Sequence, residues 1–195
     1  MTPMIREIAT DDDPVLKLIA KEIDPNTINS TEMQQLFADM EATMYSANGI
    51  GLAAPQIRVS LRVMVFYLPA ARDDIYHKGV PVTVLINPTV KPESDEKIDD
   101  YEGCLSVPGK RGKVLRYKKI RYTGLSPSGE VIDRVAEGWH ARLVQHEFDH
   151  LNGILYPELM TEEDKLLTLE EWKAITTSSI TTTTTATSST ILASS

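Results

Sequence analysis

The sequence predicts an α+β domain in which a mostly antiparallel sheet wraps around one central helix. Helical periodicity marks both ends of the chain, whereas alternating, β-branched segments fill its middle. The helical segment at residues 137–152 has apolar side chains on two nearly opposite sides, which is typical of a helix buried inside a domain. The chain has 195 residues, the length of one domain, and we expect that domain to cover residues 1–175.

Local signals predict where the helices begin and end. Pro14 favours the first turn of a short helix that ends near residue 23. A capping-box pattern at residues 29–32 opens a second helix over residues 33–45, and Gly153 occupies the position of a left-handed cap after the central helix. We expect a last short helix at residues 165–174.

Strand signals lie between these helices. Alternating or β-branched segments at residues 61–67 and 82–86 predict two strands. Residues 117–125 and 130–136 flank a Ser-Pro-Ser-Gly turn at residues 126–129, which predicts a hairpin.

The end of the chain has a different composition. Residues 176–195 are almost entirely Thr, Ser and Ala. Such a segment cannot bury enough apolar surface to fold alone, so we expect a disordered tail without a catalytic role.

Charge and cysteine content narrow the class of protein. The formal net charge of −8 argues against a nucleic-acid-binding surface. Basic side chains do cluster at residues 110–119; we expect a solvated strand edge there, with a local binding patch as the alternative. A single cysteine excludes an intramolecular disulfide, and no apolar signal peptide opens the chain, so we expect a cytoplasmic protein that does not bind membranes.

The central helix contains the pattern H-E-x-x-H. His146 and His150 are four residues apart, so both lie on one helical face and can reach one metal ion. Glu147 lies beside them, close enough to handle a proton without being a ligand. Chance histidines on a surface helix are the alternative. The pattern favours a central metal-binding helix, and a third ligand would strengthen that interpretation.

Cys104 is the candidate for the third ligand. A free cysteine is most often a small buried apolar residue, but Gly103 and the turn-forming residues 106–109 give this one an unusual backbone environment. One Cys with two His leaves a fourth metal position open, as catalytic sites require.

A third segment, residues 48–56, contains Gly49 and Gly51 around a single aliphatic residue. Glycines at this spacing let a ligand approach the backbone closely, although the pattern lacks the third glycine of a dinucleotide-binding loop. A loop that merely ends a helix is the alternative.

Together, the segments at residues 49–56, 102–106 and 145–153 resemble the three signature motifs of peptide deformylases, in the same order. The resemblance extends over about residues 3–160. It implies a metal-dependent hydrolase that removes the formyl group from N-formylmethionine at the amino terminus of newly made polypeptides and releases formate.

The resemblance also implies roles for individual residues. The metal ligands would be Cys104, His146 and His150, and the catalytic groups Glu147, the Gln56 amide and the Leu105 backbone N–H. The substrate-binding residues would be Gly49, Ile50, Gly51, Glu102 and Gly103. We further expect Glu102 to pair with Arg111, and Asp149 to orient a ligand histidine.

Cofactor and partners follow from the same resemblance. We expect one divalent metal per chain, Fe(II), for which Zn(II), Ni(II) or Co(II) can substitute. N-formylmethionyl nascent peptides are the expected partners, and the ribosome is a candidate because bacterial members can dock there. The alternatives are an H-E-x-x-H metallopeptidase, a metal-stabilised module without activity, and an inactive relative that binds the ribosome.

Overall fold

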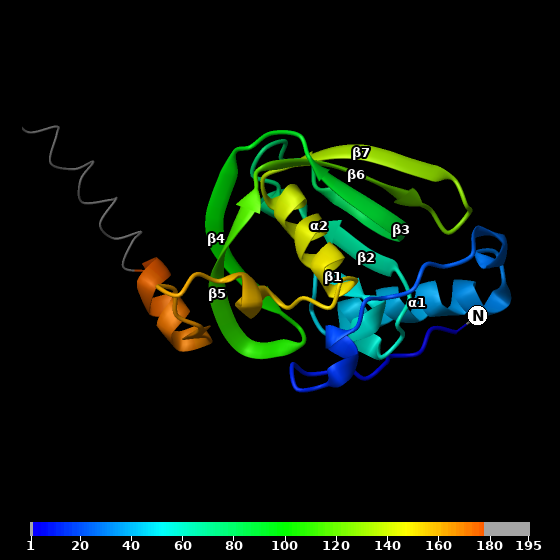
Figure 1. The fold of residues 1–195 in the computed structure, drawn as a ribbon, viewed down its shortest axis with the longest axis horizontal. Coiled ribbons are helices and arrows are strands. Elements are labelled where there is room, and N and C mark those ends of the chain that lie inside the picture. Colours follow the sequence, from blue (N-terminus) through cyan, green and yellow to red (C-terminus); the bar gives the residue numbers. More distant parts are fainter. Residues whose placement is uncertain (1, 178–195) are drawn as a thin grey trace, which may run out of the picture.

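In the computed structural model, which describes residues 2–177, strands surround one central helix (Figure 1). That helix, α2 (Trp139–His150), contacts strands of both sheets. The strands form a five-stranded sheet in the order β1-β2-β3-β6-β7 and a three-stranded sheet in the order β4-β5-β8, and every pairing is antiparallel. The predicted α+β class, with an antiparallel sheet around a central helix, is confirmed.

The bounds of the elements are as follows. The strands are β1 (Gly51–Ala53), β2 (Val63–Leu68), β3 (Val80–Pro92), β4 (Lys97–Cys104), β5 (Val107–Tyr117), β6 (Lys119–Leu125), β7 (Val131–Glu137) and β8 (Leu167–Thr168). Besides α2, the chain forms α1 (Thr31–Ser46) and the short 3₁₀ helices η1 (Pro14–Lys17), η2 (Pro25–Thr27), η3 (Ala54–Ile57), η4 (Ala70–Arg72) and η5 (Tyr156–Leu159).

The second predicted helix and the predicted hairpin are confirmed. Ser30 caps α1 by accepting a hydrogen bond from the Met33 amide at 3.3 Å, and the inner face of α1 is buried. β6 and β7 pair along their whole length across the turn at residues 126–129.

The first predicted helix is wrong in length, because only η1 forms. Beyond it, the chain is not helical and bonds to distant parts of the chain: Ala20 N donates to Leu151 O at 2.9 Å, and Lys21 N donates to Ser60 O at 3.0 Å. A longer helix would have used these amides internally. Tertiary hydrogen bonds therefore outweigh local helical preference here.

The hairpin of β4 and β5 was not predicted as such. The turn was expected at residues 106–109, but β4 ends at Cys104 and β5 resumes at Val107, so only Leu105 and Ser106 form the turn. The basic segment at residues 110–119 belongs largely to β5 and is not a simple solvated edge, because Arg116 is only 6% exposed.

The last helix begins and ends later in the chain than the predicted residues 165–174. Residues 169–177 are helical, so the helix begins after residue 165 and includes Thr176 and Thr177, the first two residues of the predicted tail. The remainder of that tail, residues 178–195, lies outside the described residues. In the described part of the chain, no helix has both the length and the apolar character needed to cross a membrane.

Candidate metal centre and substrate cleft

Helix α2 holds His146 and His150 in the interior of the domain. Ala141, Val144 and Leu151 are fully buried on the helix flank, as the two-sided apolar pattern predicted. Gln145 anchors the helix to β5: its amide donates to the Tyr117 carbonyl at 2.8 Å and accepts from the Tyr117 amide at 3.1 Å. After the helix, Gly153 has the predicted left-handed conformation, with φ of 74°.

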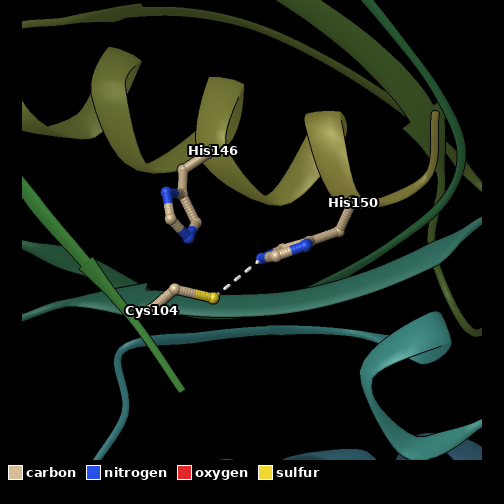
Figure 2. A group of neighbouring side chains, drawn as sticks. All are labelled: Cys104, His146 and His150. Atoms are coloured by element: carbon tan, nitrogen blue, oxygen red, sulfur yellow. Dashed lines mark hydrogen bonds between the residues drawn. The ribbon is translucent and has the colours of Figure 1, made fainter. Parts of the chain in front are cut away.

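Three side chains converge beneath this helix. Figure 2 shows His146 and His150 of α2 and Cys104 at the end of β4 pointing toward one another. The Cys104 Sγ lies 3.2 Å from the His150 Nε2, and one potential ligand atom from each residue lies within 4.8 Å of those of the other two. Such spacing suits one shared metal ion.

The chemistry of the three groups fits a metal as well. Burial alone would raise the pKa of the Cys104 thiol, but the charge of His150 and hydrogen bonds from both histidines hold that pKa well below its usual range. A thiolate and two imidazoles form a soft ligand set for a divalent transition metal. Among residues 2–177 this cluster offers three potential protein ligands, which would leave a fourth position for water or substrate.

Glu102 connects the cysteine strand to the helix. Its Oε2 lies 2.9 Å from Nδ1 of His146, and its two oxygens accept from Arg116 at 2.9 and 3.0 Å and from Arg142 at 2.8 Å. Burial raises the pKa of Glu102, but the hydrogen bonds from His146 and Arg116 outweigh it, and the net shift is strongly downward. Glu102 is therefore a buried carboxylate held by two arginines.

Two expectations about this network are wrong. Glu102 pairs with Arg116 and Arg142 instead of Arg111, because the register of β4 and β5 carries Arg116 into the interior. Asp149 does not bond to a ligand histidine; it forms an ion pair with Arg116. Glu102 is the residue that contacts His146 and orients its ring. Asp149, which is more exposed, pairs with Arg116, the arginine that also binds Glu102.

Glu147 lies between the metal ligands and β1. Its side chain is buried, and its Oε2 has no hydrogen-bond partner among the described residues. A methyl group placed on Gly51 would lie 2.6 Å from the Glu147 Cδ, so the glycine leaves the space that this carboxyl group occupies. Burial raises the pKa of Glu147 to about 7, where a group can both accept and return a proton near neutral pH.

The Gln56 amide is fixed in one orientation. Its Oε1 accepts a hydrogen bond from the Ala53 amide at 2.8 Å, and its Nε2 donates to Ser106 Oγ at 3.1 Å. Nε2 also lies 3.5 Å from the Cys104 Sγ, which places an N–H donor at the edge of the metal centre. Ser106 was not singled out in the sequence, because only the folded turn brings it to Gln56.

Most of the predicted site residues line a single cavity of about 480 Å³. The predicted site residues that line it are Gly49, Ile50, Gly51, Gln56, Glu102, Gly103, Cys104, Leu105, His146 and Glu147. His150 lies behind this wall, 1% exposed. Sequence reasoning did not assign several further lining residues to the site, among them Arg72, Trp139, Arg142, Leu143, Leu169 and Trp172. In the sequence, these residues stand in segments that look like ordinary core or surface segments, so no local signal marks them as part of a site.

Three potential metal ligands beside a buried glutamate, in a cleft of about 480 Å³, fit a metal-dependent hydrolase. Comparison with known proteins agrees: the model of the polypeptide deformylase family matches residues 5–166. The chain belongs to the polypeptide deformylase family and is an enzyme of that class. The comparisons give no support to the H-E-x-x-H metallopeptidase alternative.

Curated relatives match over most of their length. Peptide deformylase 2 of Ralstonia nicotianae is 53% identical over 156 residues, which cover 79% of this chain and 86% of the relative. Peptide deformylase 1 of Nitrosomonas europaea is 47% identical over 154 residues, with the same coverage of both chains.

Solved structures agree in fold. The class I type b peptide deformylase from Acinetobacter baumannii with Met-Ala-Ser bound is 38% identical, with a TM-score of 0.74, over 82% of this chain and 100% of that one. A peptide deformylase from Legionella pneumophila is also 38% identical, with a TM-score of 0.70, over 82% of this chain and 88% of that one.

Proposed function

We propose that this enzyme removes the formyl group from N-formylmethionine at the amino terminus of newly made polypeptides and releases formate. The observation that carries the proposal is that one cleft contains a three-ligand centre, a buried Glu147 and the fixed Gln56 donor. The relative with Met-Ala-Ser bound supports a peptide that begins with methionine.

The ligand set would hold one divalent metal through Cys104, His146 and His150, and that ion would polarise the formyl carbonyl and activate water. Glu147 would take a proton from the attacking water and return it to the departing amine, which suits its pKa near 7. As the carbonyl oxygen gains negative charge, the Gln56 Nε2 and the Leu105 backbone N–H would stabilise it as fixed donors.

Two edge strands, β1 and β4, offer a place for the peptide. β1 lies at the edge of the five-stranded sheet and β4 at the edge of the three-stranded sheet, and both line the cleft through Gly51 and Gly103. An extended peptide could pair with such an edge as an added strand. We therefore assign Gly49, Ile50, Gly51 and Gly103 to peptide binding. Glu102 lines the same cleft, and we assign it the role of holding the His146 ring in place.

Metal identity and cellular context are part of the proposal. We propose Fe(II) as the native metal, as the family resemblance implies. Zn(II), Ni(II) and Co(II) would substitute for it, because affinity order alone does not choose among these metals for a thiolate and two imidazoles. We also propose one catalytic domain over residues 1–175, a cytoplasmic location and the ribosome as a partner. Metal analysis of anaerobically purified protein tests the first point, and sedimentation with ribosomes tests the last.

Formate release tests the activity directly. Anaerobically prepared enzyme should release formate from formyl-Met-Ala-Ser, lose that activity with a chelator, and regain it with Fe(II) or Ni(II). The matched substrate is acetyl-Met-Ala-Ser, whose extra methyl group crowds the attacked carbonyl. Equal hydrolysis of both peptides, or cleavage of internal peptide bonds, would contradict the proposed function.

A further inference from the structure

The C-terminal segment forms part of the wall of the substrate cleft, although it lies after the residues that the family model matches. β8 attaches it to the domain by pairing with β5, Lys110 opposite Thr168 and Arg111 opposite Leu167. The helical residues 169–177 follow at once and lie beside the β4–β5 hairpin (Figure 1). The segment is therefore held by backbone pairing to a strand that itself borders the cleft.

The start of this helix is fixed by a reciprocal cap. The Thr168 Oγ1 accepts a hydrogen bond from the Glu171 amide at 3.2 Å, and the Glu171 Oε2 accepts from the Thr168 amide at 2.6 Å. Such a capping box defines where a helix begins and in which direction it leaves the strand. The side chains of the first turn consequently have defined positions.

One face of the helix is turned toward the cleft. Leu169 and Trp172 are half-buried and line the cavity, whereas Glu170, Glu171 and Lys173 are exposed. Positions three apart lie on the same side of a helix, so Leu169 and Trp172 present one continuous apolar surface.

Arg111 links this surface to the metal centre. Its guanidinium carbon lies 5.6 Å from the centre of the Trp172 ring system, in the range of a cation–π contact. The same guanidinium lies across Gly103, where an added methyl group would be 2.8 Å from the Arg111 Nε. Gly103 precedes the ligand Cys104, so the wall runs from the metal centre over Arg111 to Trp172.

The indole also has an unused donor. The Trp172 Nε1 is buried and has no acceptor among residues 2–177. A buried donor without an acceptor is costly, and a bound ligand that supplied a carbonyl oxygen would relieve that cost.

We propose that Leu169 and Trp172 are specificity-determining residues that contact the second and third residues of the substrate peptide. With the methionine at the metal centre, we place these residues along the wall of Gly103, Arg111 and Trp172, which an extended peptide advancing about 3.3 Å per residue would follow. The apolar helix face favours apolar or aromatic side chains there, and the charge of Arg111 disfavours Lys and Arg. The inference rests on the proposed deformylase activity.

The test compares a long substrate with a short one. For Trp172→Ala, we expect KM for formyl-Met-Phe-Ala to rise by roughly 10-fold or more, since removing an apolar contact from a pocket changes discrimination by about 10–200-fold. For formyl-Met amide, which ends before the proposed contact, kcat and KM should stay unchanged. Leu169→Ala should act in the same direction, and Trp172→Phe, which keeps an aromatic ring but lacks the indole N–H, should restore only part of the affinity.

Lys173→Ala, on the exposed face of the same helix, is the matched control and should behave as wild type. Wild-type enzyme should also prefer formyl-Met-Phe-Ala over formyl-Met-Lys-Ala, and Trp172→Ala should reduce that preference. An unchanged KM for the long peptide in both Trp172→Ala and Leu169→Ala would overturn the proposal, as would equal losses on both substrates. Failure of wild type to deformylate either substrate would instead contradict the proposed function.

Discussion

The Glu102 Oε2 lies 2.9 Å from Nδ1 of His146, so the ring nitrogen left to bind a metal is Nε2. This contact joins the cysteine motif to the histidine motif across 44 positions of sequence. Because Arg116 and Arg142 bind the same carboxylate, the orientation of the His146 ring depends on a buried network of charges.

Replacement of Glu102 should therefore affect both stability and metal binding. Glu102→Ala leaves two buried arginines without their shared partner, which should cost about 3–5 kcal/mol in free energy of unfolding. Glu102→Gln keeps the shape and should weaken zinc affinity by roughly 10–100-fold through the loss of orientation at His146. Urea denaturation and competitive zinc titration measure the two effects. Asp99→Asn, which breaks an exposed pair with Lys113, is the control and should change neither.

Glu147→Gln should retain metal and fold but lose activity. The amide cannot carry a proton between water and the leaving amine, and general acid–base catalysis contributes roughly 10²–10⁴-fold in rate. We expect kcat for formyl-Met-Ala-Ser to fall by that factor, with metal content unchanged by elemental analysis. Turnover within a few-fold of wild type would remove Glu147 from the proposed mechanism.

Cys104→Ser should weaken metal binding and change the preferred metal. A hydroxyl is a harder donor than a thiol and ionises less readily, so soft divalent ions lose their best ligand. Substitution with Co(II) gives a direct reading, because the sulfur-to-cobalt charge-transfer band should disappear in the variant. A band of wild-type intensity would show that Cys104 is not a ligand.

A methyl group at Gly51 should reduce kcat in addition to obstructing the peptide. The sequence predicts only the obstruction, which would raise KM. In the structure, however, the added carbon would lie 2.6 Å from the Glu147 Cδ, so the carboxyl group must move. Gly49→Ala is the comparison, since its methyl would meet the flexible end of Leu105 at 2.8 Å. Equal, small effects of both changes on kcat would contradict this interpretation.

Asp73 should stabilise the loop before β3 in a pH-dependent manner. Its carboxylate accepts backbone hydrogen bonds from Ile75, Tyr76, Lys78 and Gly79. Those bonds, from Tyr76 first, lower its pKa from 3.8 to about 2. A lowered pKa in the folded state contributes stability above pH 3.8, and that contribution is lost as pH falls toward 2.

The measurement for Asp73 is thermal unfolding of wild type and Asp73→Asn across pH. At pH 7 the variant should have the lower Tm, and the difference should shrink between pH 3.8 and 2. Asp74→Asn provides a neighbouring control, since the Asp74 carboxylate accepts its hydrogen bond from the Trp139 amide, outside this loop. A Tm difference that is constant over this range would mean that the Asp73 charge does not stabilise the loop.

The local features of the site could be predicted from the sequence. The i, i+4 spacing of His146 and His150 is a property of any α-helix, and the left-handed cap at Gly153 follows from glycine's conformational freedom. The three motifs were expected to share one site, and the structure brings them to one cavity. Helix α1 and the β6–β7 hairpin were also predictable, because caps and turns act within a few residues.

Other features depend on partners that are far apart in the chain. The sequence determined which groups the site would contain, since residue type and short spacing fix their chemistry. The tertiary structure decided that Arg116 and Arg142 bind Glu102, that residues 18–23 are not helical, and that Trp172 borders the cleft. Each of these outcomes follows from strand register or from hydrogen bonds between distant segments, and neither is encoded in the periodicity of a single segment.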